Sequence, residues 1–165
     1  MSELFQRAVE EVLRYEGGYS YDPNDPGGET NWGISKAGHP EIDVKNLTRE
    51  KAIAIYEKDY WLAAGCDQLP PIFAIPLFDG AVNHGVKLII RKLQGALGVE
   101  VDGTVGPETI EAAHAASVNR PWEVLADFLA RRAVLYARQA GFLRFGRGWM
   151  TRLFNLQRFV IEVVK

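Results

Sequence analysis

The sequence predicts a mostly α-helical protein with at most a short β-hairpin after the first helix, and three observations support this. Apolar residues recur every three to four positions through most of the chain, which is the spacing of one buried helix face. Capping residues and prolines stand where such stretches begin, and glycines follow where several of them end. Strand signal is minimal and is confined to one segment near residue 20, so helices dominate.

The first predicted helix runs from Ser2, a suitable N-cap, to Glu16, where Gly17 and Gly18 end it. Its buried face consists of Leu4, Phe5, Ala8, Val9, Val12 and Leu13. Glu16 occupies the next position of this apolar face. Burial and the negative end of the helix dipole both disfavour a charged carboxylate, so Glu16 is predicted to be a proton donor near neutral pH. The alternative is a glutamate that turns out to solvent at a frayed helix end.

Residues 19–40 form an irregular segment rich in glycine, proline and aspartate. Loops longer than about 12–15 residues in a compact domain usually carry function. The segment has room for one hairpin, in which residues 19–21 face residues 31–34.

Helical patterns cover the rest of the chain. Thr48 caps a second helix that reaches Trp61, and Pro70-Pro71 is a sharp break. Later helices are predicted over 74–84, 87–97, from the turn at 101–109 to about 117, over 121–139 and over 151–164. The interval from Trp61 to Pro71 is the one candidate for a boundary between lobes, and we expect a single domain over 1–165.

Charge is distributed unevenly along the chain, although the net charge is only −2. The segment 128–161 contains no acidic residue, but it contains Arg131, Arg132, Arg138, Arg144, Arg147, Arg152 and Arg158. This pattern indicates attraction to a polyanion, or arginines that pair with acidic residues of the N-terminal part within the fold. Cys66 is the one cysteine, which excludes an internal disulfide and indicates a small buried side chain.

Acidic side chains follow Glu16 closely, and Asp25 and Glu29 are candidates for a second catalytic group. Asp22, Asn24 and Asp25 are also compatible with a calcium loop. However, Pro26 stands where that loop needs aspartate or asparagine, and the final glutamate is missing at its spacing. The three histidines lack paired ligand spacing, so no metal site is predicted.

Sugar-compatible side chains surround these carboxylates. Tyr19, Thr30, Asn31 and Trp32 combine aromatic faces with an amide and a hydroxyl, as a carbohydrate cleft requires. The alternative is that Tyr19 and Trp32 anchor the loop in the core. Glycoside hydrolysis needs a protonated acid and a second group that acts as base or nucleophile, and Glu16 with Asp25 or Glu29 fits these roles.

The same segment resembles the signature of the glycoside hydrolase 108 family, lysozyme-like N-acetylmuramidases of which many are phage endolysins. The resemblance lies in Glu16-Gly17-Gly18-Tyr19, Asp22-Pro23 and residues 25–34, and it continues in 47–50, Ala52, Tyr56, 59–61, Phe78-Asp79, 81–83 and Gly85. Residues 86–165 resemble the predicted peptidoglycan-binding segment usually fused to that family, through Leu93-Gln94, 97–99, 101–103, Gly106-Pro107, Thr109, Gly148-Trp149 and Arg152. Asp102 and Gly103 themselves have the character of turn residues.

The resemblance implies a lysozyme-like fold with a catalytic half over 1–85. It implies that Glu16 is the catalytic acid, with Asp25, or a water held by Thr30, completing the displacement. It also suggests that Asn83 contacts substrate from a helix face shared with Asp79, where a hydrogen bond within or between helices is the alternative.

These considerations lead us to expect hydrolysis of the β-1,4 bond between N-acetylmuramic acid and N-acetylglucosamine in peptidoglycan, without a cofactor. The N-terminus lacks the features of a secretory signal. This fits an endolysin, as the resemblance implies, that stays in the host cytoplasm until release. We also expect the protein to be a monomer. The alternatives are a lytic transglycosylase and a non-catalytic wall-binding or secretion-associated protein; nucleic-acid binding lacks a recognisable motif. A basic amphipathic surface for outer-membrane lipid is also predicted, from Arg147, Trp149, Met150, Arg152, Phe154 and Arg158.

Overall fold

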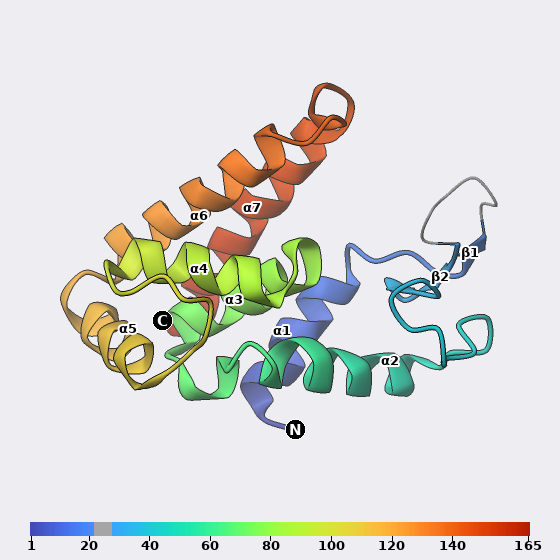
Figure 1. Cartoon of the computed structure of the whole chain (residues 1–165), viewed down its shortest axis with the longest axis horizontal. Coiled ribbons are helices and arrows are strands. Elements are labelled where there is room, and N and C mark those ends of the chain that lie inside the picture. The colour runs from blue at the N-terminus through green and yellow to red at the C-terminus, as the bar shows by residue number, and fades with distance from the viewer. Residues whose placement is uncertain (22–27) are drawn as a thin grey trace. The chain divides into compact units, whose positions relative to one another are not determined.

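Helices dominate the computed structural model, which describes residues 1–21 and 28–165. Within these residues the chain forms seven α-helices and one small antiparallel sheet near the N-terminus, which confirms the predicted fold class (Figure 1). The chain divides into two compact units, an N-terminal unit over Met1–Asp59 and a C-terminal unit over Tyr60–Lys165. The division falls just before the interval in which the sequence allowed a boundary.

The first helix of the N-terminal unit, α1 (Glu3–Leu13), begins as predicted, because the Ser2 hydroxyl accepts a hydrogen bond from the Phe5 amide at 3.2 Å. The predicted apolar face is buried apart from Leu4. The helix ends earlier than predicted, however, at Leu13 rather than at Glu16. The Tyr15 amide donates to the Val12 carbonyl, three residues back, and such tightening closes the last turn. Glu16 therefore lies in a bend beyond the helix.

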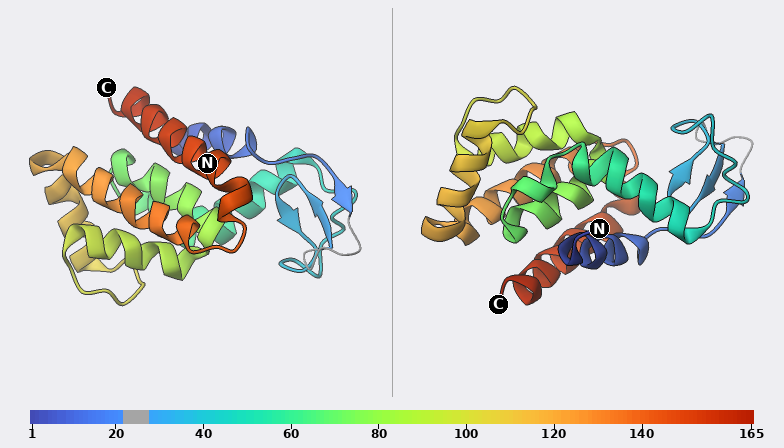
Figure 2. Two further views of the ribbon diagram at one scale, coloured as in Figure 1. Left: turned by 90° about the horizontal axis from the view of Figure 1, so that it is seen from above. Right: turned by 90° about the horizontal axis from the view of Figure 1, so that it is seen from below.

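Three short strands follow, and they lie side by side in both views of Figure 2: β1 (Ser20–Tyr21), β2 (Glu29–Asn31) and β3 (Ile34–Ser35). The register pairs Tyr21 with Glu29 and Asn31 with Ile34. The expected hairpin thus becomes a three-stranded meander. The extra strand forms because residues 32 and 33 both have positive φ, 53° and 75°, as a tight two-residue hairpin turn requires.

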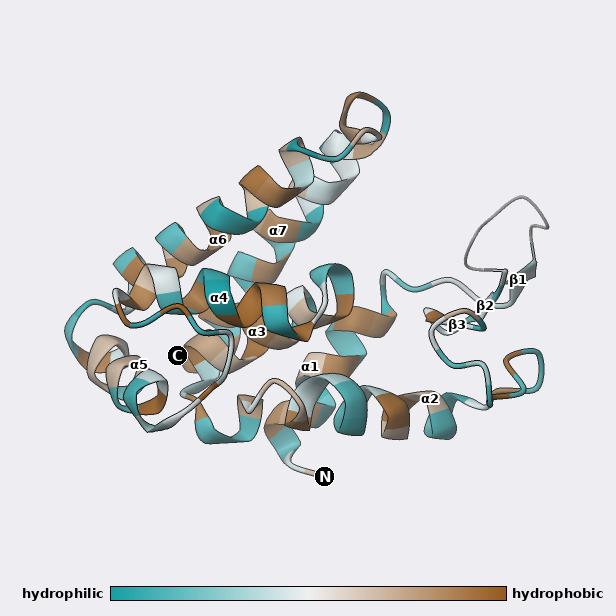
Figure 3. Cartoon of the chain, viewed as in Figure 1, coloured by the Kyte–Doolittle hydropathy of each residue, from teal (hydrophilic) through white to brown (hydrophobic). Residues whose placement is uncertain are grey.

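The remaining helices follow the predicted pattern with shifted ends. Helix α2 (Arg49–Tyr56) is capped by Thr48 and continues as a π-helical segment, η1 (Glu57–Leu62), which crosses the boundary between the units. The C-terminal unit contains the 3₁₀ helix η2 (Cys66–Gln68), α3 (Pro71–His84), α4 (Val86–Leu97), α5 (Pro107–Asn119), α6 (Pro121–Ala137) and α7 (Phe142–Val164). Cys66 is buried, as predicted. Figure 3 shows apolar and polar residues alternating along α6 and α7.

Helix α7 begins nine residues earlier than predicted, since the glycines in 141–148 argue locally against a helix. Packing explains the glycine at position 146, because a Cβ there would lie 2.7 Å from the ring of Phe142. The ring of Phe142 thus packs on the backbone one turn later in the same helix, which a larger residue at position 146 would prevent.

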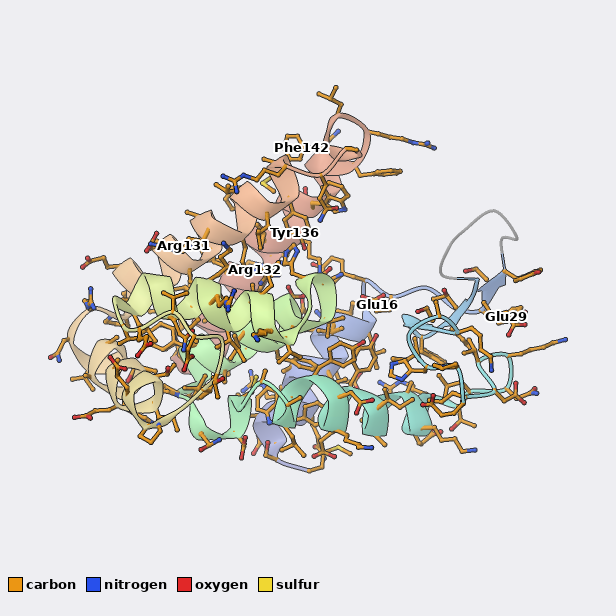
Figure 4. The ribbon with its side chains drawn as sticks, viewed as in Figure 1. Glu16, Glu29, Arg131, Arg132, Tyr136 and Phe142 are labelled. Atoms are coloured by element: carbon orange, nitrogen blue, oxygen red, sulfur yellow. The ribbon has the colours of Figure 1, made fainter. Side chains whose placement is uncertain are left out.

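A buried ion-pair cluster joins three helices of the C-terminal unit. Asp79 on α3 accepts hydrogen bonds from Arg132 on α6 and from Arg152 on α7, whose Nη2 lies 2.8 Å from Asp79 Oδ1. Arg132 also donates to the Pro76 carbonyl at 3.1 Å, and its side chain is completely buried (Figure 4). Burial alone would raise the pKa of Asp79, but the two guanidinium groups together lower it. Two of the arginines in the acid-free segment are thus ion-paired inside the fold.

Two aromatic residues and a histidine pack beside this cluster. The rings of His84 and Tyr136 are 4.5 Å apart, and Tyr136 stacks on Trp149 at 5.3 Å. Burial, with the positive charge of Arg132, lowers the pKa of His84 to about 4. His84 is therefore neutral near pH 7 and adds no further positive charge to the cluster.

Removing the shared anion should destabilise the C-terminal unit strongly. We expect Asp79→Asn to lower the free energy of unfolding by about 3–5 kcal/mol, because two guanidinium groups then stay buried without a counter-charge. Asp127→Asn is the matched control, since Asp127 pairs with Arg131 at the surface of one helix and such pairs contribute less than about 1 kcal/mol. Urea unfolding measures both. Equal effects of the two substitutions would contradict the assignment of Asp79.

Candidate active site

The carboxyl group of Glu16 lies against the turn between β2 and β3. Glu16 is half-buried at the end of the α1 segment (Figure 4). A Cβ atom placed on Gly33 would come within 2.6 Å of Glu16 Oε2 and within 2.4 Å of the Tyr56 hydroxyl oxygen. The carboxylate and the phenol hydroxyl are therefore neighbours on the same side of the turn, in the space that the missing Gly33 side chain leaves open.

Side-chain hydrogen bonds fix this turn on the segment 44–47. The Trp32 indole N–H donates to the Leu47 carbonyl at 3.2 Å, and the Asn31 amide nitrogen lies 3.1 Å from the Val44 carbonyl and 3.4 Å from that of Leu47. Asn31 is buried, with only 7% of its surface exposed. The Asn31 amide nitrogen therefore makes hydrogen bonds inside the protein, and the sequence analysis did not predict these bonds. Substrate contact by Asn31 or Trp32 stays a prediction.

The first two strands present tyrosines to solvent. Tyr19 and Tyr21 are 44% and 62% exposed. The Tyr19 hydroxyl donates to Glu29 Oε1 at 3.0 Å, and desolvation together with this carboxylate raises the pKa of Tyr19. Thr30 is half-buried on the central strand, paired with Ser20 and Ser35. The exposed aromatic faces have the chemistry expected of a sugar-binding surface.

The second catalytic group is not settled by the described residues. Asp25 lies outside them, as do Asp22, Asn24 and Pro26, so its predicted role stays a prediction. Glu29, the other candidate carboxylate, lies on the sheet apart from Glu16 (Figure 4). In the part of the chain that the structure describes, no three His, Cys, Asp or Glu side chains gather as a metal site.

Asn83 belongs to the C-terminal unit, in the last turn of α3. Its amide nitrogen donates to the Asp79 carbonyl at 2.6 Å, one turn earlier in the same helix. This bond corresponds to the alternative that the sequence left open. The Asp79 carboxylate, on the same helix face as Asn83, forms ion pairs with two arginines. A substrate contact by Asn83 stays a prediction.

Two residues at the site were missed as functional residues by sequence reasoning, Gly33 and Tyr56. The signal for Gly33 was partial, because a glycine between two short alternating segments favours a hairpin turn, although such turns favour asparagine or aspartate where Trp32 stands. Tyr56 gave no such signal, since a tyrosine at a buried helix position is ordinarily a core residue. Its hydroxyl is close to Glu16 because both groups lie against the turn at Trp32-Gly33.

A separate hydrogen-bonded turn organises the region of residues 101–104. Gly103 has φ of 86°, and its amide donates to Gln94 Oε1 at 2.8 Å. The Gln94 amide nitrogen in turn donates to Asp102 Oδ1 at 2.7 Å, and the Thr104 amide donates to the same oxygen. Asp102 and Gly103 thus act as turn residues, as their types indicated.

Comparisons with known proteins agree with this arrangement. A family model described as glycosyl hydrolase 108 matches residues 9–85, and one described as a predicted peptidoglycan domain matches residues 88–154. The solved structure of Brucella abortus SagA is similar to the chain, with 30% sequence identity and a TM-score of 0.83; the similarity covers 96% of this chain and 94% of that one. No curated protein matches the sequence. Within the described residues, no helix is both long and apolar enough to span a bilayer.

Proposed function

The chain belongs to the glycosyl hydrolase 108 family, and from this premise we propose that it is an N-acetylmuramidase with Glu16 as the general acid. The family and the peptidoglycan domain support a hydrolase role on peptidoglycan. The finer proposal is that the enzyme cleaves the β-1,4 bond between N-acetylmuramic acid and N-acetylglucosamine.

One observation carries the assignment of Glu16. Glu16 is half-buried, and its carboxyl group lies against the Gly33 backbone beside the Tyr56 hydroxyl, within the segment that the hydrolase model matches. A general acid must hold a proton at a defined position beside the leaving oxygen, and a confined carboxyl group meets that need.

The proposed reaction needs only a proton donor and an attacking group. Glu16 protonates the glycosidic oxygen as the bond to the anomeric carbon breaks. Asp25, or a water held by Thr30, attacks the anomeric carbon, and water finally supplies the hydroxyl of the new reducing end. Neither step calls for a cofactor. The expected monomeric state and the expected residence in the host cytoplasm before release stay predictions.

Digestion of purified peptidoglycan tests the assignment. We expect the wild type to release muropeptides with reducing N-acetylmuramic acid ends, and Glu16→Gln to lose at least about a hundredfold of this activity, since an amide cannot donate the proton. Mass spectrometry of the products measures both. Glu3→Gln is the matched control, because Glu3 is an exposed glutamate in the first turn of α1 and is not a candidate for the site.

Three other results would change the proposal. Full activity of Glu16→Gln would remove Glu16 from the mechanism. Products with anhydro ends would identify a lytic transglycosylase. Binding of peptidoglycan without any cleavage by the wild type would identify the non-catalytic wall-binding protein.

A second proposed function concerns the tip between α6 and α7, residues 138–147, which we call the arginine tip. Leu143 is completely exposed and Phe145 is 49% exposed, and the brown colour at this tip in Figure 3 shows its hydrophobic residues. Arg138, Arg144 and Arg147 are exposed in the same segment, with Arg144 over the Phe145 ring at 4.9 Å. Exposed apolar side chains among cations suit an anionic lipid surface.

The structure corrects one member of the predicted lipid-binding surface. Arg152 is buried against Asp79, so it cannot face lipid. The arginine tip provides exposed cations instead, and Phe154 is exposed further along α7.

Vesicle binding tests this second function. We expect Leu143→Ser combined with Arg144→Glu and Arg147→Glu to weaken binding to phosphatidylglycerol vesicles by about tenfold or more, because each cation near an anionic surface contributes about 1 kcal/mol. Val118→Ser is the control, as Val118 is an equally solvent-facing apolar residue on α5. Sedimentation of the protein with vesicles gives the bound fraction. Equal binding to neutral and anionic vesicles would contradict the proposal.

A further inference from the structure

We propose that Tyr56 and the turn at Trp32-Gly33 form a positioning device for the Glu16 carboxyl group. The inference rests on the proposed function and adds residues to the same site. Tyr56 acts through the turn rather than on the substrate, so it is a positioning residue and not a catalytic one.

The turn has a conformation that its sequence does not favour. Trp32 has φ of 53°, and among the described residues it is the one non-glycine with positive φ. Bulky L residues rarely adopt this left-handed region, and two-residue turns of this kind favour asparagine or aspartate before the glycine. Such backbone strain persists only where the surroundings hold it, and it gathers at active sites.

Side chains hold the strained residue from two directions. The Tyr56 hydroxyl donates to the Trp32 carbonyl at 2.9 Å, and the Trp32 indole donates to the Leu47 carbonyl. Tyr56 is itself 1% exposed, so its ring is fixed by the core. The backbone and side chain of one residue are therefore tied separately, the backbone to α2 and the side chain to the segment 44–47.

The glycine that follows brings this fixed turn onto Glu16. A Cβ at Gly33 would lie 2.9 Å from Glu16 Cδ as well as 2.6 Å from Oε2, closer than real Cβ atoms approach. The Gly33 backbone is thus one wall of the space that holds the carboxyl group. Glu16 itself lies beyond the last residue of α1, so contacts outside that helix orient its side chain.

The helix that carries Tyr56 provides a second, independent observation. Tyr56 is the last residue of α2, and the π-helical segment η1 starts at the next residue. π-Helical turns are rare and occur frequently at functional sites. The irregularity begins directly after the residue whose hydroxyl holds the turn.

Two glycines allow a matched test. Gly28 and Gly33 both have positive φ, 66° and 75°, so alanine strains the backbone similarly at each position. Only at Gly33 would the new methyl group meet Glu16 and Tyr56; at Gly28 it would meet no atom of the described residues within 4 Å, apart from its chain neighbours. We expect Gly33→Ala to lower kcat by about a hundredfold, as a misplaced catalytic group does, while Gly28→Ala stays within about twofold of the wild type.

Tyr56→Phe keeps the ring and removes the hydroxyl that donates to the Trp32 carbonyl. We expect kcat to fall by about tenfold with KM changed by less than about twofold, because the loss affects the orientation of the acid and not the binding of the glycan. Tyr136→Phe, another buried tyrosine, controls for the loss of a hydroxyl elsewhere and should leave kcat unchanged.

A readout independent of activity separates this inference from the proposed function. The side-chain carboxyl ¹³C resonance of Glu16, assigned through its absence in Glu16→Gln, should move at fixed pH in Gly33→Ala and Tyr56→Phe but not in Gly28→Ala. An unmoved resonance, or equal kcat for the two glycine variants, would overturn the positioning role. If the wild type cleaves no peptidoglycan, the proposed function is wrong. The Glu16 resonance in the variants then tests the positioning role without any measurement of activity.

Discussion

The hydrogen bond from the Tyr56 hydroxyl to the Trp32 carbonyl is the constraint on which the candidate site depends. It holds a bulky residue in the left-handed conformation that closes β2 onto β3, and the next residue, Gly33, then lies against Glu16. Without that closure the sheet would lack its third strand, and the Glu16 carboxyl group would lack a wall. The geometry of the proposed general acid is thus supplied by a backbone turn and a buried tyrosine.

The C-terminal unit has a comparable internal constraint. The Asp79 carboxylate joins α3, α6 and α7 through two arginines, which corresponds to the interhelical role that the sequence left open as the alternative. The same pairing removes Arg152 from the predicted basic surface, whereas Arg147 and Arg158 stay exposed on α7. A buried ion pair of this kind specifies which helices meet more than it adds net stability.

Local features of the sequence predicted local features of the fold. The buried face of α1 and the caps at Ser2 and Thr48 depend on residues within one or two turns, and these predictions are confirmed. Long-range pairing was not predictable. Asn31 bonds to carbonyls 13 and 16 residues away, and Arg152 pairs with an aspartate 73 residues away. An amide suits a sugar as well as a buried carbonyl, so residue type alone could not decide the role of Asn31. Glu16 emerged as a candidate from its neighbours in sequence, whereas its confinement by Gly33 depends on tertiary structure.

The central claim is that the turn acts on catalysis through Glu16, and a double-variant cycle on kcat tests it most directly. Residues that act through one group give losses that do not add. The variant that combines Gly33→Ala with Glu16→Gln should be no slower than Glu16→Gln alone. If the two losses multiply instead, Gly33 affects the reaction by a route that does not pass through Glu16, and the account is wrong.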